Sequence, residues 1–154
     1  MQKHFLVTGG AGFIGSNYAA RLIGRGEKVT IYDNLSRHGA ECNIEWLRQS
    51  FGEESFRLIA GDVRDAELIS RVTRDVDVIV HLAGQVAVTT SIANPREDFE
   101  HNALGTFNVL EAARHSENNP IVLYASTNKV YGGMEGEPIV EDETRYHYKR
   151  LPLG

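Results

Sequence analysis

Three glycines, Gly9, Gly12 and Gly15, are spaced three residues apart in the segment VTGGAGFIGSN, between a predicted strand and a predicted helix. Glycines in such a turn allow a tight chain reversal and let the backbone approach a pyrophosphate, while the helix N-terminus supplies N–H groups and a positive dipole end. Asp33 lies 18 residues after Gly15 at the end of a second predicted strand, where a carboxylate can accept hydrogen bonds from an adenosine ribose. Together these residues predict a site for a dinucleotide.

The charges near Asp33 bear on which dinucleotide binds. A carboxylate at this position repels a 2′-phosphate, so the sequence favours NAD over NADP. Arg37 and His38 follow closely, and an arginine there could accommodate the extra phosphate. Taken alone, Asp33 is equally consistent with a turn residue before Asn34. The prediction of NAD therefore rests on Asp33 and the glycines together.

The elements that would position these residues alternate along the chain. Near-continuous apolar runs predict buried strands at residues 4–8, 28–32, 56–60, 77–83 and 121–126. Apolar residues at helical spacing lie between them, and a longer helix is predicted from Pro95, marked by Phe99, Ala103, Leu110 and Ala113. This alternation predicts an α/β fold, a Rossmann-like doubly wound parallel sheet with helices on both faces.

Composition excludes several classes of function. The chain of 154 residues has a formal net charge of −5, whereas a nucleic-acid-binding surface needs a clustered positive excess. Cys42 is the only cysteine, which excludes an internal disulfide and favours a reducing, cytoplasmic setting. No apolar run has the length of a signal peptide or a membrane span, and the six histidines are dispersed. We expect no nucleic-acid partner, no membrane association and no metal site.

Further motifs follow the glycine loop in a fixed order: DN at 33–34, GDVRD at 61–65, HLAG at 81–84, NALGTFNVLEAAR at 102–114 and ASTNKVYG at 125–132. In this order and spacing the sequence resembles the extended short-chain dehydrogenases/reductases, which include nucleotide-sugar epimerases and dehydratases. The resemblance covers essentially the whole chain. More narrowly, the loop segments DNLSRHGAECNIEWL, HLAGQVAVTTSIANP and STNKVYG resemble the CDP-tyvelose (CDP-paratose) 2-epimerases.

The resemblance implies a set of NAD-binding residues. They are Gly9, Gly12, Phe13, Ile14 and Gly15 at the pyrophosphate, Asp33 and Asn34 at the adenosine ribose, Asp62 and Val63 at the adenine edge, Leu82, Ala83, Gly84 and Gln85 along the nicotinamide ribose, and Asn102 as support. Simpler interpretations stay open for some of them. Asp62 with Val63 is also typical of a helix cap, residues 82–85 of a strand running into a loop, and Asn102 of a buried structural amide.

The catalytic side of the resemblance centres on the end of the fifth predicted strand. It implies that Thr127 is the catalytic hydroxyl and that Ser126 and Ser91 contact the substrate, a nucleotide-sugar, which in the narrower resemblance is CDP-linked. The resemblance also implies a homo-oligomer at full length. Without it, the preferred interpretation of Thr127 is a hydroxyl that bonds its own backbone at a strand end.

The family also uses a tyrosine followed four residues later by a lysine, and this sequence has no such pair. Tyr146 has Lys149 at three residues and Arg150 at four, and Pro152 would stop a helix there. We therefore expect residues 1–154 to be an incomplete NAD-binding domain, truncated after the fifth strand, that lacks its C-terminal substrate domain. The expected function is the NAD-binding part of a nucleotide-sugar epimerase that acts at carbon 2 of a CDP-dideoxyhexose. The alternatives are a non-catalytic NAD-sensing module and a fragment of a 4-epimerase or 4,6-dehydratase.

Overall fold

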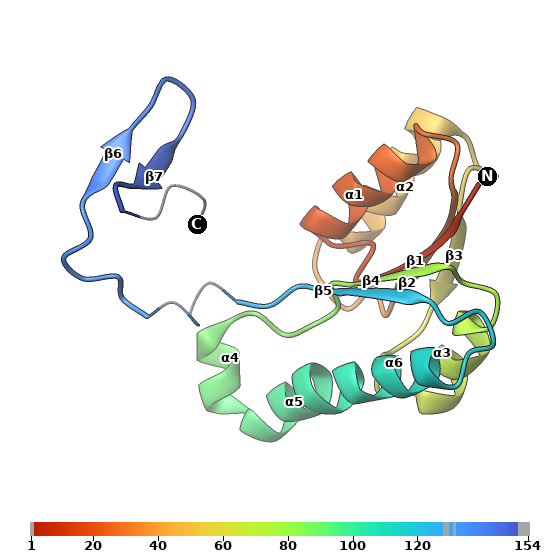
Figure 1. Cartoon of the computed structure of the whole chain (residues 1–154). Coiled ribbons are helices and arrows are strands. Elements are labelled where there is room, and N and C mark those ends of the chain that lie inside the picture. The colour runs from red at the N-terminus through yellow and green to blue at the C-terminus, as the bar shows by residue number, and fades with distance from the viewer. Residues whose placement is uncertain (1, 128–129, 131, 151–154) are drawn as a thin grey trace.

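A computed structural model describes residues 2–127, 130 and 132–150 of the chain (Figure 1). Its centre is a sheet of five parallel strands in the order β3-β2-β1-β4-β5. The strands are β1 (His4–Thr8), β2 (Lys28–Asp33), β3 (Arg57–Ala60), β4 (Val78–His81) and β5 (Ile121–Tyr124). All five coincide with predicted strands, and the doubly wound α/β fold is confirmed.

Helices cover both faces of the sheet. They are α1 (Phe13–Ile23), α2 (Ala40–Phe51), α3 (Ala66–Thr73), α4 (Val88–Ala93), α5 (Pro95–Phe99), the π-helical turn η1 (Glu100–Leu104) and α6 (Gly105–Arg114). Figure 1 shows α1 and α2 on one face of the sheet and α3 and α6 on the other.

Alternation along the strands explains the two layers. Leu6 and Ile79 point to the face of α3 and α6, whereas Val7, Ile31 and Val80 point to the face of α1 and α2. Each of these side chains is at most 5% exposed. Because successive residues of a strand point to opposite faces, a strand buried on both faces must be apolar at every position. This is why these strands stand out in the sequence as continuous apolar runs.

The helix after Pro95 differs from the prediction. Of the residues that marked it, Phe99 and Leu110 are 64% and 47% exposed, while Val109 and Ala112 pack against the sheet. The turn η1 interrupts the regular helix at Glu100–Leu104 and changes the angular position of every later side chain. The short helix α4 was not predicted, because none of its residues is buried and it shows no apolar stripe.

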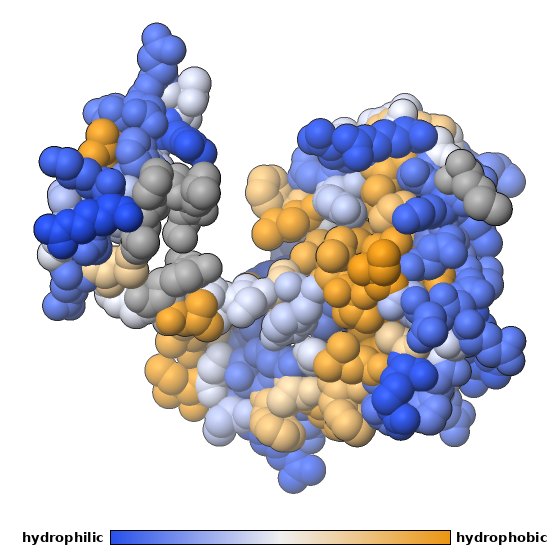
Figure 2. Space-filling model, viewed as in Figure 1, coloured by the Kyte–Doolittle hydropathy of each residue, from blue (hydrophilic) through white to orange (hydrophobic). Residues whose placement is uncertain are grey.

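Two further strands, β6 (Ile139–Glu141) and β7 (Tyr146–Tyr148), form an antiparallel hairpin that lies apart from the sheet in Figure 1. Tyr146 is therefore in a strand, and Pro152 lies outside the described residues. Apolar side chains also remain exposed on the main body, including Phe13 and Ile14 at 82% and 66%, and Figure 2 shows apolar surface over α1 and α4. Among the described residues, no helix is both long enough and apolar enough to cross a membrane.

Candidate functional site

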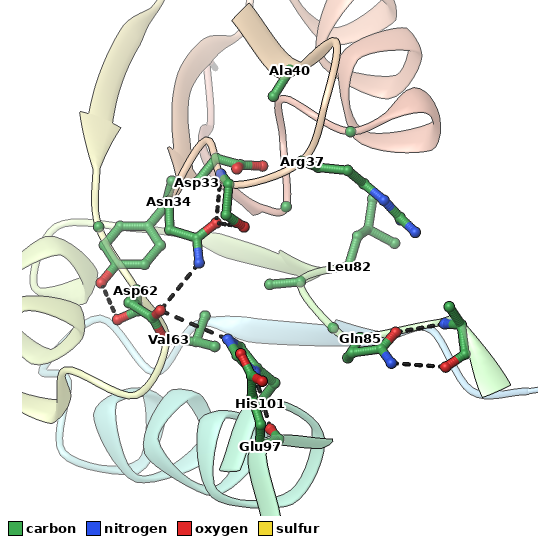
Figure 3. A pocket seen from close by; sticks show the side chains of 18 of the residues that line it. Asp33, Asn34, Arg37, Ala40, Asp62, Val63, Leu82, Gln85, Glu97 and His101 are labelled. Carbon is green, nitrogen blue, oxygen red and sulfur yellow. Dashed lines mark hydrogen bonds and ion pairs between the residues drawn. The ribbon is translucent and has the colours of Figure 1, made fainter. Parts of the chain in front are cut away.

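A groove of about 330 Å³ lies at the carboxyl ends of the strands (Figure 3). Its walls come from the segments that follow β1, β2, β3 and β4, and from residues of α5 and η1. In the strand order, β1 is the point where the chain turns from one half of the sheet to the other. Ligands of open α/β sheets bind in the crevice at this switch point, so the groove is where the fold class expects a site.

The glycine loop forms the floor of the groove. Gly9 has a φ of 67°, and a Cβ on it would lie 2.7 Å from the backbone nitrogen of Ala83. A Cβ on Gly15 would overlap the carbonyl oxygen of Gly9 and lie 2.7 Å from Cα of Gly10. Larger residues are therefore excluded at both positions, since the groove wall and the first turn of α1 press against the loop.

The first turn of α1 has the character of an anion site. Within the described chain, no side chain caps this turn and none of its residues is acidic. The Gly12 N–H donates to the carbonyl of Gly9 at 3.1 Å, which folds the loop under the helix N-terminus. The uncapped N–H groups and the positive end of the helix dipole suit a bound phosphate.

Asp33, at the end of β2, is held by two backbone donors. Its Oδ2 accepts from the Ala11 N–H at 3.0 Å, and its Oδ1 accepts from the Leu35 N–H at 2.9 Å. The carboxylate is half-buried and lines the groove. Asp33 is thus a turn residue and a groove residue together, because one carboxylate has enough acceptor positions for both.

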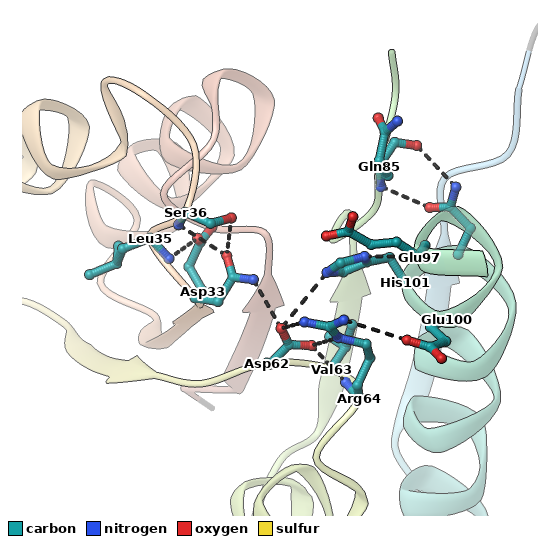
Figure 4. A network of polar contacts seen from close by, with 12 residues as sticks. Asp33, Leu35, Ser36, Asp62, Val63, Arg64, Gln85, Glu97, Glu100 and His101 are labelled. Carbon is teal, nitrogen blue, oxygen red and sulfur yellow. Dashed lines mark hydrogen bonds and ion pairs between the residues drawn. The ribbon is translucent and has the colours of Figure 1, made fainter. Parts of the chain in front are cut away.

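Asp62 is the centre of a polar network at the same end of the groove (Figure 4). The backbone N–H and Nε of Arg64 donate to its Oδ1, each at 2.9 Å, and Arg64 Nη2 donates to its Oδ2 at 2.8 Å. Asn34 Nδ2 donates to the same Oδ2 at 3.1 Å. The bonds from Arg64, more than any other cause, hold the pKa of Asp62 well below its usual range. Asp62 is therefore ionised.

Asp62 does not cap the following helix. That role belongs to Asp65, whose Oδ1 accepts from the Leu68 N–H at 2.9 Å at the start of α3. His101 of η1 faces Asp62 across the groove, with 3.8 Å between Nε2 and Oδ2. The helix-cap interpretation of Asp62 is wrong, since its carboxylate points into the network at the groove.

The opposite wall, residues 82–85, is fixed by Asn102. Its Oδ1 accepts from the Gln85 N–H at 2.8 Å, and its Nδ2 donates to the Gln85 carbonyl at 3.0 Å. A Cβ on Gly84 would lie 2.9 Å from Asn102 Oδ1, so a larger residue at this position would displace the Asn102 amide. Asn102 is half-buried in η1 and supports the wall from behind. The interpretation of residues 82–85 as a plain exit from the strand is incomplete, because the amide clamps them.

Comparison with known proteins gives this geometry a family. Residues 6–152 match the family model described as GDP-mannose 4,6 dehydratase. The chain belongs to this family of NAD-dependent nucleotide-sugar epimerases and dehydratases. It is 48% identical to the CDP-paratose 2-epimerase of Salmonella typhi over 151 residues, which are 97% of this chain and 44% of that protein.

Solved structures of this family share the fold. The UDP-glucose 4-epimerase of Stenotrophomonas maltophila, with bound NAD and formylated UDP-arabinopyranose, superimposes with a TM-score of 0.75 at 27% identity, over 85% of this chain and 39% of that one. The dTDP-glucose 4,6-dehydratase of Streptomyces venezuelae, with NAD bound, gives 0.74 at 36% identity, over 84% and 41%. The chain thus spans about two fifths of the length of these relatives.

Within this chain, most of the predicted cofactor residues come together at the groove. The groove is lined by Gly9, Gly12, Asp33, Asn34, Asp62, Val63, Leu82, Ala83, Gly84 and Gln85. The predicted residues outside this lining are Phe13, Ile14, Gly15, Ser91, Asn102, Ser126 and Thr127. Phe13 and Ile14 present exposed side chains, so only their backbone N–H groups face the loop turn.

The three predicted catalytic and substrate residues, Ser91, Ser126 and Thr127, do not line the groove. Ser91 Oγ donates to Asp98 Oδ1 at 2.7 Å, next to the bond that Asn102 Nδ2 gives the same oxygen at 3.1 Å. Ser126 and Thr127 follow β5 and are exposed. The neighbouring Asn128, Lys129 and Tyr131 lie outside the described residues.

Several groove residues were not predicted. They are Tyr32, Ser36, Ala40, Gly61, Ala87, Thr90, Glu97 and His101. Tyr32 is fully buried, its Oη donates to the Asp62 carbonyl at 2.6 Å, and burial raises its pKa to about 12. Its position directly before Asp33 was a usable signal. His101 had none, because only η1 turns it towards the groove.

Proposed function

We propose that residues 1–154 form the NAD-binding part of a nucleotide-sugar epimerase that acts at carbon 2 of a CDP-linked dideoxyhexose. The carrying observation is the groove, in which a glycine loop pressed against Ala83 meets an uncapped helix start and two fixed carboxylates, Asp33 and Asp62. The identity to a CDP-paratose 2-epimerase supports the choice of substrate and carbon. The bound NAD in related structures supports the choice of cofactor.

Different residues of the groove would hold different parts of the cofactor. The glycine loop and the N–H groups of residues 13–15 would hold the pyrophosphate, which the positive end of the helix dipole would stabilise. Asp33 accepts hydrogen bonds from the adenosine ribose, and Asp62 and Val63 meet the adenine edge. Residues 82–85, supported by Asn102, lie along the nicotinamide ribose. When bound, NAD supplies the chemistry, accepting a hydride from the sugar carbon and returning it.

The catalytic part of the proposal lies at the end of β5. Thr127 hydrogen-bonds the sugar oxygen, while Ser126 and Ser91 contact the substrate. Ser91 would share its hydroxyl between Asp98 and the sugar. Because these 154 residues contain no tyrosine with a lysine four positions later, the general base comes from outside them. Residues 1–154 alone should therefore bind NAD but show no turnover of CDP-, UDP- or dTDP-hexoses.

Calorimetric titration of the chain with NAD and with NADP tests the cofactor assignment. NAD should bind more tightly, and Asp33→Asn should reduce NAD affinity about tenfold and narrow the preference, since an amide lacks the charge that repels a 2′-phosphate. Arg37→Ala should instead weaken NADP alone. Equal affinity of the wild-type chain for NAD and NADP would contradict the assignment of Asp33 to the adenosine ribose. Turnover of any nucleotide-sugar by the purified chain would overturn the placement of the base.

A further inference from the structure

One buried histidine has no part in the proposed function. His81 is the last residue of β4, directly before the groove wall of residues 82–85, and is only 2% exposed. Its Nδ1 lies 2.6 Å from Thr8 Oγ1, and its Nε2 lies 3.0 Å from Thr106 Oγ1. Both ring nitrogens are therefore used, one towards the strand that leads into the glycine loop and one towards α6.

The partners fix where each proton lies. Thr106 Oγ1 donates its only hydrogen to the carbonyl of Asn102 at 2.6 Å, so it must accept from His81 Nε2. His81 Nδ1 then carries the lone pair and accepts the hydrogen of Thr8. Thr8 Oγ1 in turn accepts from the N–H groups of Leu82 at 3.2 Å and Ala83 at 3.3 Å. One chain of hydrogen bonds, each with an assigned direction, runs through the imidazole.

Both ends of this series of hydrogen bonds lie at the same groove wall, residues 82–85. At one end are the N–H groups of Leu82 and Ala83, against which Gly9 is pressed. At the other end is Asn102, whose side chain clamps the N–H and the carbonyl of Gln85. His81 thus ties the beginning of the wall to its end through a buried imidazole, and its bond to the buried Thr8 is strengthened by the low local dielectric.

We propose that His81 is a positioning residue, which as the neutral Nε2–H tautomer sets residues 82–85 in place for the nicotinamide riboside half of the cofactor. The inference rests on the proposed function and adds a role for a residue that touches no cofactor. Burial supports it, lowering the pKa of His81 to about 4, so that the ring is neutral at physiological pH. A protonated ring would turn Nδ1 into a donor facing Thr8 and break the sequence of bonds.

The test compares two buried histidines of the same sheet. His4 also has both ring nitrogens bonded, to the Asp75 carbonyl and to Thr30 Oγ1, each at 2.9 Å, but it lies at the other end of the sheet, at the start of β1. His81→Asn and His4→Asn should both lower thermal stability. Only His81→Asn should lower NAD affinity, about tenfold, while ADP, which lacks the nicotinamide riboside, keeps its affinity within about twofold.

A second pair separates the hydrogen bond from packing. Thr106→Val keeps the shape of the side chain but removes its hydroxyl, so it should lower NAD affinity as much as His81→Asn does. Thr106→Ser keeps the hydroxyl and should retain the wild-type affinity for NAD. Nitrogen NMR of the chain should show His81 protonated at Nε2 and bare at Nδ1 from pH 5 to 8. Equal losses for NAD and ADP, an unchanged NAD affinity, or the opposite tautomer would each overturn the positioning role. A wild-type chain that binds no NAD would instead overturn the proposed function, and the NMR result would still decide the tautomer.

Discussion

The two ends of the groove differ in what holds them. At the adenosine end, Asp33 and Asp62 each accept several hydrogen bonds, and the fully buried Tyr32 supports the Asp62 backbone. The segments there follow three adjacent strands, β1, β2 and β3. A ligand at this end therefore meets groups that are already fixed, and little ordering is left for binding to achieve.

The far end of the groove, next to α4, has less support from the core of the protein. The helix α4 has no buried residue, and Val88 and Ile92 are 69% and 77% exposed, forming part of the apolar surface seen in Figure 2. Ser126 and Thr127 are exposed beyond the sheet edge. Under the proposed function, cofactor affinity and substrate chemistry therefore depend on different parts of the molecule. The described residues line a groove for the first and offer only a few groups for the second.

The largest effect is expected from disrupting the glycine loop, which contributes to both ends of the groove. Gly15→Ala places a Cβ against the Gly9 carbonyl, where backbone on both sides leaves no room to relax. We expect a loss of about 3 kcal/mol in the free energy of unfolding and no measurable binding of NAD or ADP. Urea unfolding and calorimetry measure the two effects.

Gly24→Ala is the matched control, since Gly24 is also in a right-handed helical conformation and the nearest atom to a new Cβ would be 3.3 Å away. Its effect on stability should be within about 1 kcal/mol, with NAD affinity unchanged. If Gly15→Ala still bound ADP normally, the adenosine end would not depend on the loop, and the comparison would need to be redrawn.

A pH titration tests the buried imidazole of His81, which holds the groove wall of residues 82–85. Burial lowers its pKa from 6.5 to about 4 in the folded protein, so between these values the unfolded state binds more protons. Stability is complete above pH 6.5 and falls as the pH drops towards 4, by up to about 3 kcal/mol. The aromatic ring of Tyr124 on β5 lies beside the imidazole, with 5.9 Å between the ring centroids. Urea unfolding at several pH values should show the decline in the wild type and a flatter profile in His81→Asn.

The clamp on Asp62 should have a smaller effect. Arg64→Gln removes the charged donor, so the pKa of Asp62 should rise towards its ordinary value. Asp62 and Arg64 are partly exposed, so the free energy of unfolding should change by only about 0.5 kcal/mol. NAD affinity should fall about threefold, because Arg64 no longer holds the Asp62 carboxylate in place at the groove. Carbon NMR of the carboxyl group and calorimetry give the two values. Arg114→Gln, which breaks a similar forked pair with Glu111 on α6, should leave NAD affinity unchanged.

The sequence predicted well which residues gather at the Asp33 and Asp62 end of the groove, for a physical reason. Strands buried on both faces must be apolar throughout, and the loop between β1 and α1 must carry glycine at Gly9 and Gly15 to avoid backbone overlap. These constraints are local, because the residues that impose them lie within a few positions of the site in the sequence. Asp33 follows from them, because the end of β2 lies beside the loop.

The rest depended on contacts between distant segments. The turn η1 aims His101 and Asn102 at the groove, and it precedes Gly105, where a Cβ would lie 2.5 Å from Val63. Nothing in the periodicity of that helix announces a π turn, so the apolar residues Phe99 and Leu110 were taken as its marker although they are exposed. The roles of Thr127, Ser126 and Ser91 stay predictions.

The smallest effect is expected at the far end. Ser91→Ala removes the hydroxyl that donates to Asp98, but Asp98 keeps the bond from Asn102, so the wall at Gln85 stays in place. Stability should change by less than about 0.5 kcal/mol, as for Ser50→Ala on an exposed position of α2, and NAD affinity should not change. Calorimetry on both variants decides the matter. Thr90 of α4 lines the groove but Ser91 does not. If Ser91→Ala weakened NAD binding as much as Arg64→Gln does, Ser91 would belong to the cofactor site as well, and the groove would be a single unit rather than two ends held by different parts of the fold.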